Sequence, residues 1–133
     1  MPAIVVTDIN NLFGILELST KLSEHGIQHI QHIIGCKLDV KHPNKTNHLT
    51  NVLLCAKNKK GYKNLIELVK SCFFNSTAEE YPKISLDTLG NFSEDIVLVT
   101  GRIYGSLRKI LLNEDINGAK NYLEFFQTKF DIR

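Results

Sequence analysis

The stretch VVTDINNLFGILEL, residues 5–18, joins two kinds of hydrophobic pattern and thereby indicates the class of the fold. An apolar, β-branched run over residues 3–7 predicts a short buried strand. Leucine and isoleucine then recur at helical spacing up to Leu22, and Gly26 provides a left-handed end for that helix. Polar side chains between a strand and a helix commonly form sites in α/β proteins, yet Ile9 stands in the middle of this junction.

The rest of the chain continues the alternation of strands and helices. Strands are predicted over 29–34 with an extension through 35–40, over 49–56 and over 96–100, and loops over 41–48 and 75–83. A helix after Gly61 presents one apolar face, made of Tyr62, Leu65, Ile66, Val69, Cys72 and Phe73. Further helices are predicted as one turn over 85–89 capped by Ser85, over 104–113 and over 116–130. Short links in this order favour one α/β domain with a mostly parallel sheet and right-handed crossovers.

Length, charge and cysteine usage narrow the class of protein. The 133 residues fit one domain, and the net charge of +2 signals no strong field for a nucleic acid or a membrane surface. No apolar run approaches the roughly 20 residues that span a bilayer, and no secretion signal is visible, so we expect a cytoplasmic protein. Cys36, Cys55 and Cys72 lie in apolar stretches without metal-binding spacing, which indicates buried, reduced thiols.

The histidines suggest a metal site only at first sight. His25, His29 and His32 would share one face of a helix, but Gly26 interrupts it, and on a strand neighbouring side chains alternate between faces. We therefore expect solvated loop and edge histidines. The remaining two, His42 and His48, lie in a polar stretch without useful partner spacing.

Two carboxylates, Asp8 and Asp39, are candidate site residues. Asp8 follows the first strand, where sites form in α/β sheets, but capping of the following helix by Asp8 or Asn10 is the favoured interpretation. Asp39 has Lys37 and Lys41 beside it, which indicates a solvated edge.

A second candidate site follows the strand over 96–100. Gly101 and Gly105 could offer backbone amides to a phosphate, and Arg102, Arg108 and Lys109 would suit an anion there. The full phosphate-loop pattern is missing, so a surface cluster is the favoured interpretation.

The ordered strings MPAIVVTDINNLFG, IIGCKL, LLCAKNKKGYKNLIELV and IVLVTGRIYGSLRKILLN resemble consecutive blocks of the PHP domain of the bacterial DNA polymerase III alpha subunit. The resemblance covers nearly the whole chain, and the blocks TDxxNLFG and AKNxxGYxNL are specific together. It implies a distorted (β/α)7 barrel, of which residues 1–133 would form a single partial domain without the first strand and the distal strands.

The resemblance also implies which residues would hold metal. In metal-binding members a histidine follows TD, a glutamate ends GCE, a histidine begins the strand before AKN and a cysteine ends SGC. The matching positions here carry Ile9, Lys37, Asn51 and Arg102, although a shifted register would place His48 near the third. Isoleucine has no lone pair, and lysine and arginine add positive charge, so no catalytic, cofactor or metal site and no cofactor is expected.

The implied function is that of a non-catalytic fragment with a structural role in DNA replication. Its partners would be the remainder of the polymerase III alpha subunit and the proofreading exonuclease subunit, without direct nucleic-acid or membrane contact. The parent family is a DNA-directed DNA polymerase, but no polymerase activity is expected of this chain alone. The alternatives are a PHP phosphoesterase using Asp8, His29, His32 and His48, and an α/β module that binds a phosphorylated ligand.

Overall fold

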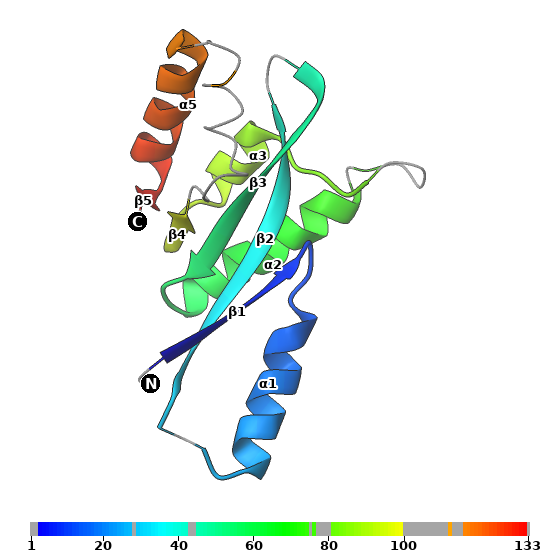
Figure 1. Ribbon diagram of the computed structural model, residues 1–133, viewed down its shortest axis with the longest axis vertical. Coiled ribbons are helices and arrows are strands. Elements are labelled where there is room, and N and C mark those ends of the chain that lie inside the picture. Colours follow the sequence, from blue (N-terminus) through cyan, green and yellow to red (C-terminus); the bar gives the residue numbers. More distant parts are fainter. Residues whose placement is uncertain are drawn as a thin grey trace.

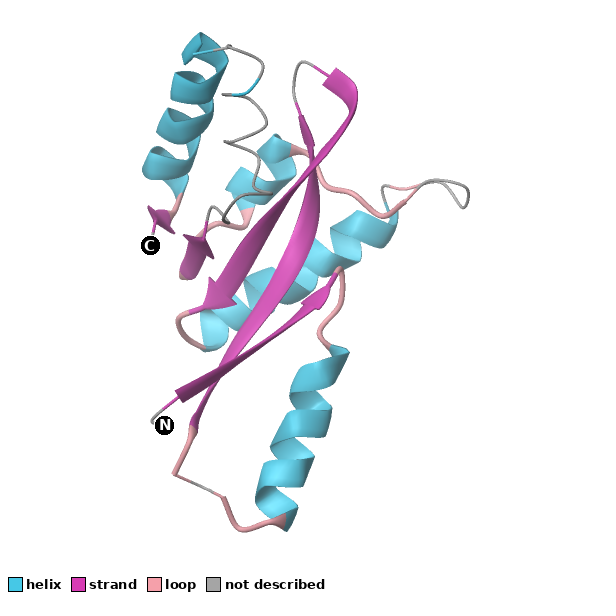
Figure 2. Ribbon diagram, in the orientation of Figure 1, coloured by secondary structure: helices cyan, strands magenta, loops and turns pink. Residues whose placement is uncertain are grey.

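The computed structural model describes residues 3–27, 29–42, 45–74, 76, 81–99, 112 and 116–132. Its elements are, in chain order, β1 (Ala3–Ile9), α1 (Phe13–Glu24), β2 (Gln31–His42), β3 (Lys45–Ala56), α2 (Lys59–Phe74), α3 (Leu86–Asn91), β4 (Ile96–Val99), α5 (Ile116–Lys129) and β5 (Asp131–Ile132) (Figure 2). The predicted α/β class is confirmed, and most predicted elements are present within a few residues. The loop Gly101–Gly105 and the helix predicted over 104–113, apart from Leu112, lie outside the described residues.

The five described strands form one mixed sheet in the order β1-β2-β3-β4-β5 (Figure 1). β1 and β2 are parallel, as are β4 and β5, whereas β3 runs antiparallel to both of its neighbours. The prediction of a mostly parallel sheet is therefore wrong. Only two residues separate His42 from Lys45, and so short a link can join only antiparallel strands.

The polar stretch 41–48, predicted as a loop, belongs mostly to this hairpin, because β2 continues to His42 and β3 begins at Lys45. Polar composition reports contact with water, which a strand end projecting beyond the core also has. Figure 1 shows the hairpin of β2 and β3 reaching past the other strands. Composition alone therefore predicted the wrong backbone conformation there.

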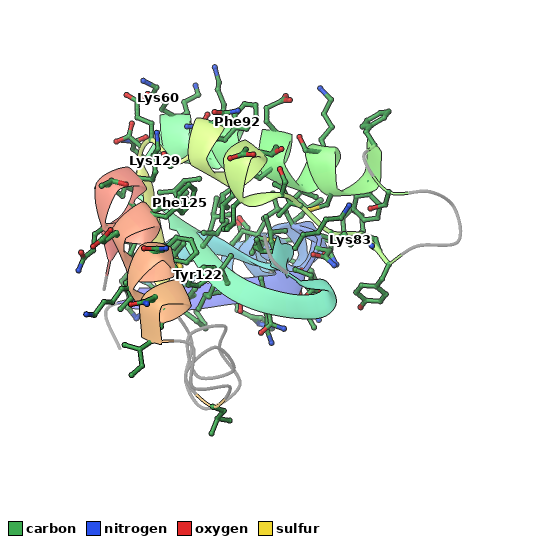
Figure 3. All side chains as sticks on the ribbon, turned by 90° about the horizontal axis from the view of Figure 1, so that it is seen from above. Lys60, Lys83, Phe92, Tyr122, Phe125 and Lys129 are labelled. Atoms are coloured by element: carbon green, nitrogen blue, oxygen red, sulfur yellow. The ribbon has the colours of Figure 1, made fainter. Side chains whose placement is uncertain are left out.

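The core lies on one face of the sheet. Alternate residues of β2 and β3 are fully or almost fully buried, and α2 and α3 cover that face (Figure 3). Tyr122 and Phe125 project from α5 toward the interior in the same view, and Phe126 is 1% exposed. The buried hydrophobic cluster comprises Cys36, Leu38, Val40, Val52, Leu54, Leu65, Leu68, Cys72, Ile84, Leu89, Ile96, Leu98, Ala119, Tyr122, Phe126 and Phe130.

The buried face of α2 differs from the predicted one. Leu65 and Cys72 are buried as predicted, but Leu68 is also buried, while Ile66 is 39% and Phe73 54% exposed. Apolar side chains cover a wider sector of this helix, its apolar arc, than the line of residues that packs against the sheet. Periodicity therefore identified the apolar arc but not which of its residues form that contact line. Part of the arc is therefore left on the surface.

Two predicted helix-end signals, Gly26 and Ser85, are confirmed, and the structure adds a cap at Asn58 that was not predicted. Gly26 has a φ of 66°, the left-handed conformation that glycine adopts readily. Ser85 accepts a hydrogen bond from the backbone N–H of Thr88 at the start of α3. At the start of α2, the Oδ1 of Asn58 accepts from the backbone N–H groups of Lys60 and Gly61.

Candidate functional site

The second face of the sheet carries the positions that the sequence resemblance singled out. Because register partners share a face, Ile9 lies beside Lys37 on β2, and Asn51 on β3 lies opposite Asp39. Lys37 and Asp39 are two residues apart on β2 and therefore also share this face. We name Ile9, Lys37, Asp39 and Asn51 the strand-face cluster.

Asp39 is the buried member of this cluster. It is only 7% exposed, so its interpretation as part of a solvated edge is wrong. The Nδ2 of Asn51 donates to its Oδ1 at 3.3 Å, and the Nδ2 of Asn10 donates to its Oδ2 at 3.5 Å. Both carboxylate oxygens thus accept from neutral side-chain amides, which explains how a carboxylate is accommodated away from water.

Asn10 continues the pairing of β2 where β1 ends. Its φ is 56°, a conformation that asparagine tolerates better than most residues, and its backbone N–H donates to the Lys37 carbonyl at 2.8 Å. Its Oδ1 accepts from the backbone N–H of Asp39 at 3.3 Å, and its Nδ2 also lies 3.3 Å from the Pro82 carbonyl oxygen. Asn10 therefore does not cap α1; its side chain takes the place of a strand residue.

The segment after Pro82 then completes the same edge of β2. The backbone N–H of Ile84 donates to the carbonyl of Asp39 at 2.9 Å, and that of Lys41 donates to the carbonyl of Ile84 at 2.8 Å. The sequence pattern predicted only a capping role for Asn10 and did not reveal this segment. The contacts join residues from 27 to 72 positions apart, so the available local signal was only asparagine's tolerance of a positive φ.

Asp8 acts as the predicted helix cap. Its Oδ2 accepts from the backbone N–H of Gly14, in the first turn of α1, at 2.6 Å. A Cβ at Gly14 would lie 2.8 Å from that oxygen, so only glycine fits this close approach without a shift. Asn11 supports the same turn, because its Oδ1 accepts from the backbone N–H of Phe13 at 3.1 Å.

The histidines whose side chains are described, His25, His29 and His32, do not surround a common point. His25 follows α1 and is exposed, His29 precedes β2, and His32 lies within β2 beside Ile4 of β1. The side chains of His42 and His48 lie outside the described residues. Among the described side chains, no three histidines, cysteines, aspartates or glutamates could jointly hold a metal ion.

The three cysteines are free thiols, as predicted. Burial is the main cause that raises the pKa of Cys36 from 9.0 to about 12 and that of Cys72 to about 11. Burial also raises the pKa of Cys55, which is only partly covered. Protonated thiols are poor metal ligands and poor nucleophiles, so these residues serve packing.

The strand-face cluster does not fit a divalent cation. Ile9 offers no donor atom and is 53% exposed, and Lys37 carries an ammonium group on the same face. The amide of Asn51 donates to Asp39, whose oxygens also accept from Asn10. Arg102, the fourth position, lies outside the described residues.

Comparison with known proteins adds the family. The family described as "PHP domain" matches residues 1–132. DNA polymerase III subunit alpha of Vibrio cholerae serotype O1 is 28% identical over 130 residues, covering 98% of this chain and 11% of that protein. The subunits of Buchnera aphidicola subsp. Acyrthosiphon pisum and Escherichia coli K12 are 30% and 27% identical, over 98% and 100% of this chain and 11% of each relative.

These relatives are far longer than this chain, which spans about a tenth of their length. None of the helices in the described ranges is long and apolar enough to cross a membrane. The family match over nearly every residue and the aligned segments of three alpha subunits agree with each other. The chain therefore belongs to the PHP-domain family and is homologous to a segment of the DNA polymerase III alpha subunit.

Proposed function

We propose that this chain is a non-catalytic PHP-domain segment that serves a structural role in the cytoplasmic replication machinery. The observation that supports the proposal is the side-by-side placement of Ile9 and Lys37, two residues that the sequence resemblance matches to metal ligands of the family. A cation between these strands would meet an aliphatic side chain and a positive charge, so both coordination and electrostatics oppose it.

The family motifs of this chain support the proposal because their remaining residues act on the backbone. In TDINNLFG, Asp8 and Asn11 satisfy first-turn amides of α1, and Gly14 allows the close approach. These contacts hold the fold and require no metal. The motif thus keeps the residues with structural contacts, Asp8, Asn11 and Gly14, although Ile9 stands at the position proposed for a metal ligand.

The motif AKNKKGYKNL supports the same reading. Asn58 caps α2, and a side chain at Gly61 would overlap the carbonyl oxygen of Asp95. The Nδ2 of Asn64 donates to the backbone carbonyl of Glu94 at 2.9 Å. Asn58 thus fixes the start of α2, and Gly61 and Asn64 hold that start against the turn before β4.

Metal analysis tests the proposal directly. Purified protein dialysed against zinc or manganese and then passed over a desalting column should retain no stoichiometric ion by mass spectrometry. It should also release no product from p-nitrophenyl phosphate, with or without a chelator. Two or three tightly held ions per chain, or chelator-sensitive hydrolysis, would refute the proposal and favour the phosphoesterase alternative.

The proposed partners are the remainder of an alpha subunit and its proofreading exonuclease subunit. Homology to a segment of the alpha subunit supports membership of that assembly. Co-expression of the chain with each candidate, followed by size-exclusion chromatography, tests it. Co-elution with at least one of them is expected, and elution of the chain apart from both would contradict the proposal.

A further inference from the structure

An apolar groove lies between α1 and α2, away from the strand-face cluster. It encloses about 580 Å³, and its lining is almost entirely hydrophobic: Leu12, Phe13, Ile15, Leu16, Ser19, Ile34, Tyr62 and Ile66. Figure 1 shows α1 standing apart from the other helices at one end of the sheet. The groove is open to solvent rather than an enclosed cavity.

The walls of the groove expose large apolar side chains. No residue of α1 is fully buried, and Phe13 and Leu16 are 82% and 73% exposed. On α2, Ile66 is 39% exposed although it belongs to the apolar arc of that helix. A concentration of exposed hydrophobic side chains in one groove is typical of a surface that a partner covers.

A row of lysines runs beside the groove. Lys59, Lys63 and Lys70 are exposed and share one edge of α2 with Ile66, at spacings of four and seven residues. Lys70 pairs with Glu67 at 3.2 Å, whereas no carboxylate of a described residue lies within ion-pair distance of Lys59 or Lys63. On α1, Glu17 pairs with Lys21 of its own helix at 2.6 Å. The edge of the groove along α2 is therefore positively charged.

We propose that this groove binds an acidic amphipathic helix of a partner polypeptide. The docking role proposed above names no surface of this chain, and the groove would be that surface. Apolar side chains of the partner would fill the space between Phe13 and Ile66, and its carboxylates would face Lys59 and Lys63. A helix suits the groove because side chains line it, and a helix satisfies its own backbone hydrogen bonds.

A second copy of this chain is a poorer occupant. Its helices α2 and α5 carry more lysines than carboxylates, and α3 is only six residues long. Its α1 has more acidic than basic residues but already forms one wall of the groove. Charge complementarity thus points to a different polypeptide.

The test uses a fluorescein-labelled designed helix about four turns long, with leucines along one face and glutamates on both flanks. Fluorescence anisotropy measures its affinity for the full 133-residue chain. The variant Phe13→Ser should bind at least about tenfold more weakly, because the lost aromatic anchor lies in the groove. Phe74→Ser is the matched control: Phe74 is 81% exposed, lies outside the groove lining, and should leave the affinity unchanged.

A charge reversal tests the lysine row. The double variant Lys59→Glu/Lys63→Glu should bind the acidic peptide about tenfold more weakly and should gain affinity for a peptide with lysines in place of the glutamates. Lys129→Glu on α5 is the control and should change neither affinity. Circular dichroism of each variant separates a loss of binding from a loss of folding.

Equal affinity of the unaltered chain and Phe13→Ser, or no binding of the acidic peptide at all, would overturn the proposal. A dimer in light scattering that Phe13→Ser converts to a monomer would also overturn it, since the occupant would then be a second copy. Metal content takes no part in these measurements. The docking inference and the proposed loss of catalysis can therefore fail separately.

Discussion

The two faces of the central strands β2 and β3 carry residues of different polarity, although these residues are neighbours in the sequence. On one face Cys36, Leu38 and Leu54 are completely buried under helices. On the other face lie the alternating neighbours, Lys37 and Asp39, which carry charge. The first face is held by hydrophobic packing, whereas the second is held by the hydrogen bonds of Asp39.

The two faces of this sheet therefore have different roles: one forms the core, and the other carries the strand-face cluster. The packed face forms the core, and its residue types follow the rule of apolar burial. The other face carries Ile9, Lys37 and Asn51, the positions that the sequence resemblance matches to metal ligands of the family. A hydrophobic core thus lies on one face, and an aliphatic, a cationic and an amide side chain occupy these positions on the other.

The largest expected effect comes from testing the packed face against its neighbour. Leu54→Ala should lower the free energy of unfolding by about 2–5 kcal/mol, because the fully buried side chain leaves a cavity. Leu53→Ala removes the same atoms from the partly covered face and should cost about 1 kcal/mol. Urea titrations measure both values, and equal losses would show that the two faces are equally packed.

The second prediction tests whether the side chains at positions 9, 37 and 51 of the strand-face cluster can reach one common metal ion. The triple variant Ile9→His/Lys37→Glu/Asn51→His places three donors on one face, enough for a zinc site with an open position. It should retain one zinc ion per chain, and zinc at about 100-fold above its dissociation constant should stabilise it by about 2.7 kcal/mol. Ile9→His alone is the control and should retain none. Absence of zinc from the triple variant would contradict the shared face.

Removing the carboxylate of Asp39 should have a smaller effect. Asp39→Ala leaves the amides of Asn10 and Asn51 without their acceptor and should cost about 1–3 kcal/mol. Asp39→Asn keeps one acceptor oxygen and should fall between Asp39→Ala and the unaltered chain. Asp87→Ala, at an exposed position in α3, is the control, and a loss as large as that of Asp39→Ala would contradict the buried network.

The reactivity of the cysteine thiols also distinguishes the two faces of the sheet. Cys36 lies on the packed face and its pKa is raised to about 12, whereas Cys55 lies on the other face and is only partly covered. A maleimide reagent at neutral pH should therefore modify Cys55 first, and Cys36 and Cys72 only when the chain unfolds. Mass spectrometry of peptides from a timed reaction locates the label. Early modification of Cys36 would show that the core face opens readily.

The raised pKa of Cys36 also sets a pH dependence of stability. The folded thiol stays protonated up to about pH 12, while the unfolded thiol ionises near 9.0, so its contribution is complete below pH 9 and is lost above it. Stability should fall by about 1.4 kcal/mol per pH unit for this thiol within that window. Cys36→Ala should have a shallower fall, and an unchanged slope would show that Cys36 has no part in it.

The sequence by itself determined the α/β class and several of the helix ends, and it led to the hypothesis of substituted ligand positions. These follow from short-range physics: β-branched runs, helical spacing, helix-end residues such as Gly26 and Ser85, and residues without donor atoms such as Ile9. The family resemblance rested on the same local strings. Such signals are legible because each depends on residues only a few positions apart.

Only the tertiary structure decided the mixed sheet, the contact line of α2 and the burial of Asp39. Asp39 is covered because Asn10 and the segment after Pro82 continue the edge of β2, although they are distant in sequence. Ile66 is left in a groove because α1 is too far from the core to bury it. Which apolar or polar residue meets which partner depends on the packing of whole elements, and no local pattern contains that information.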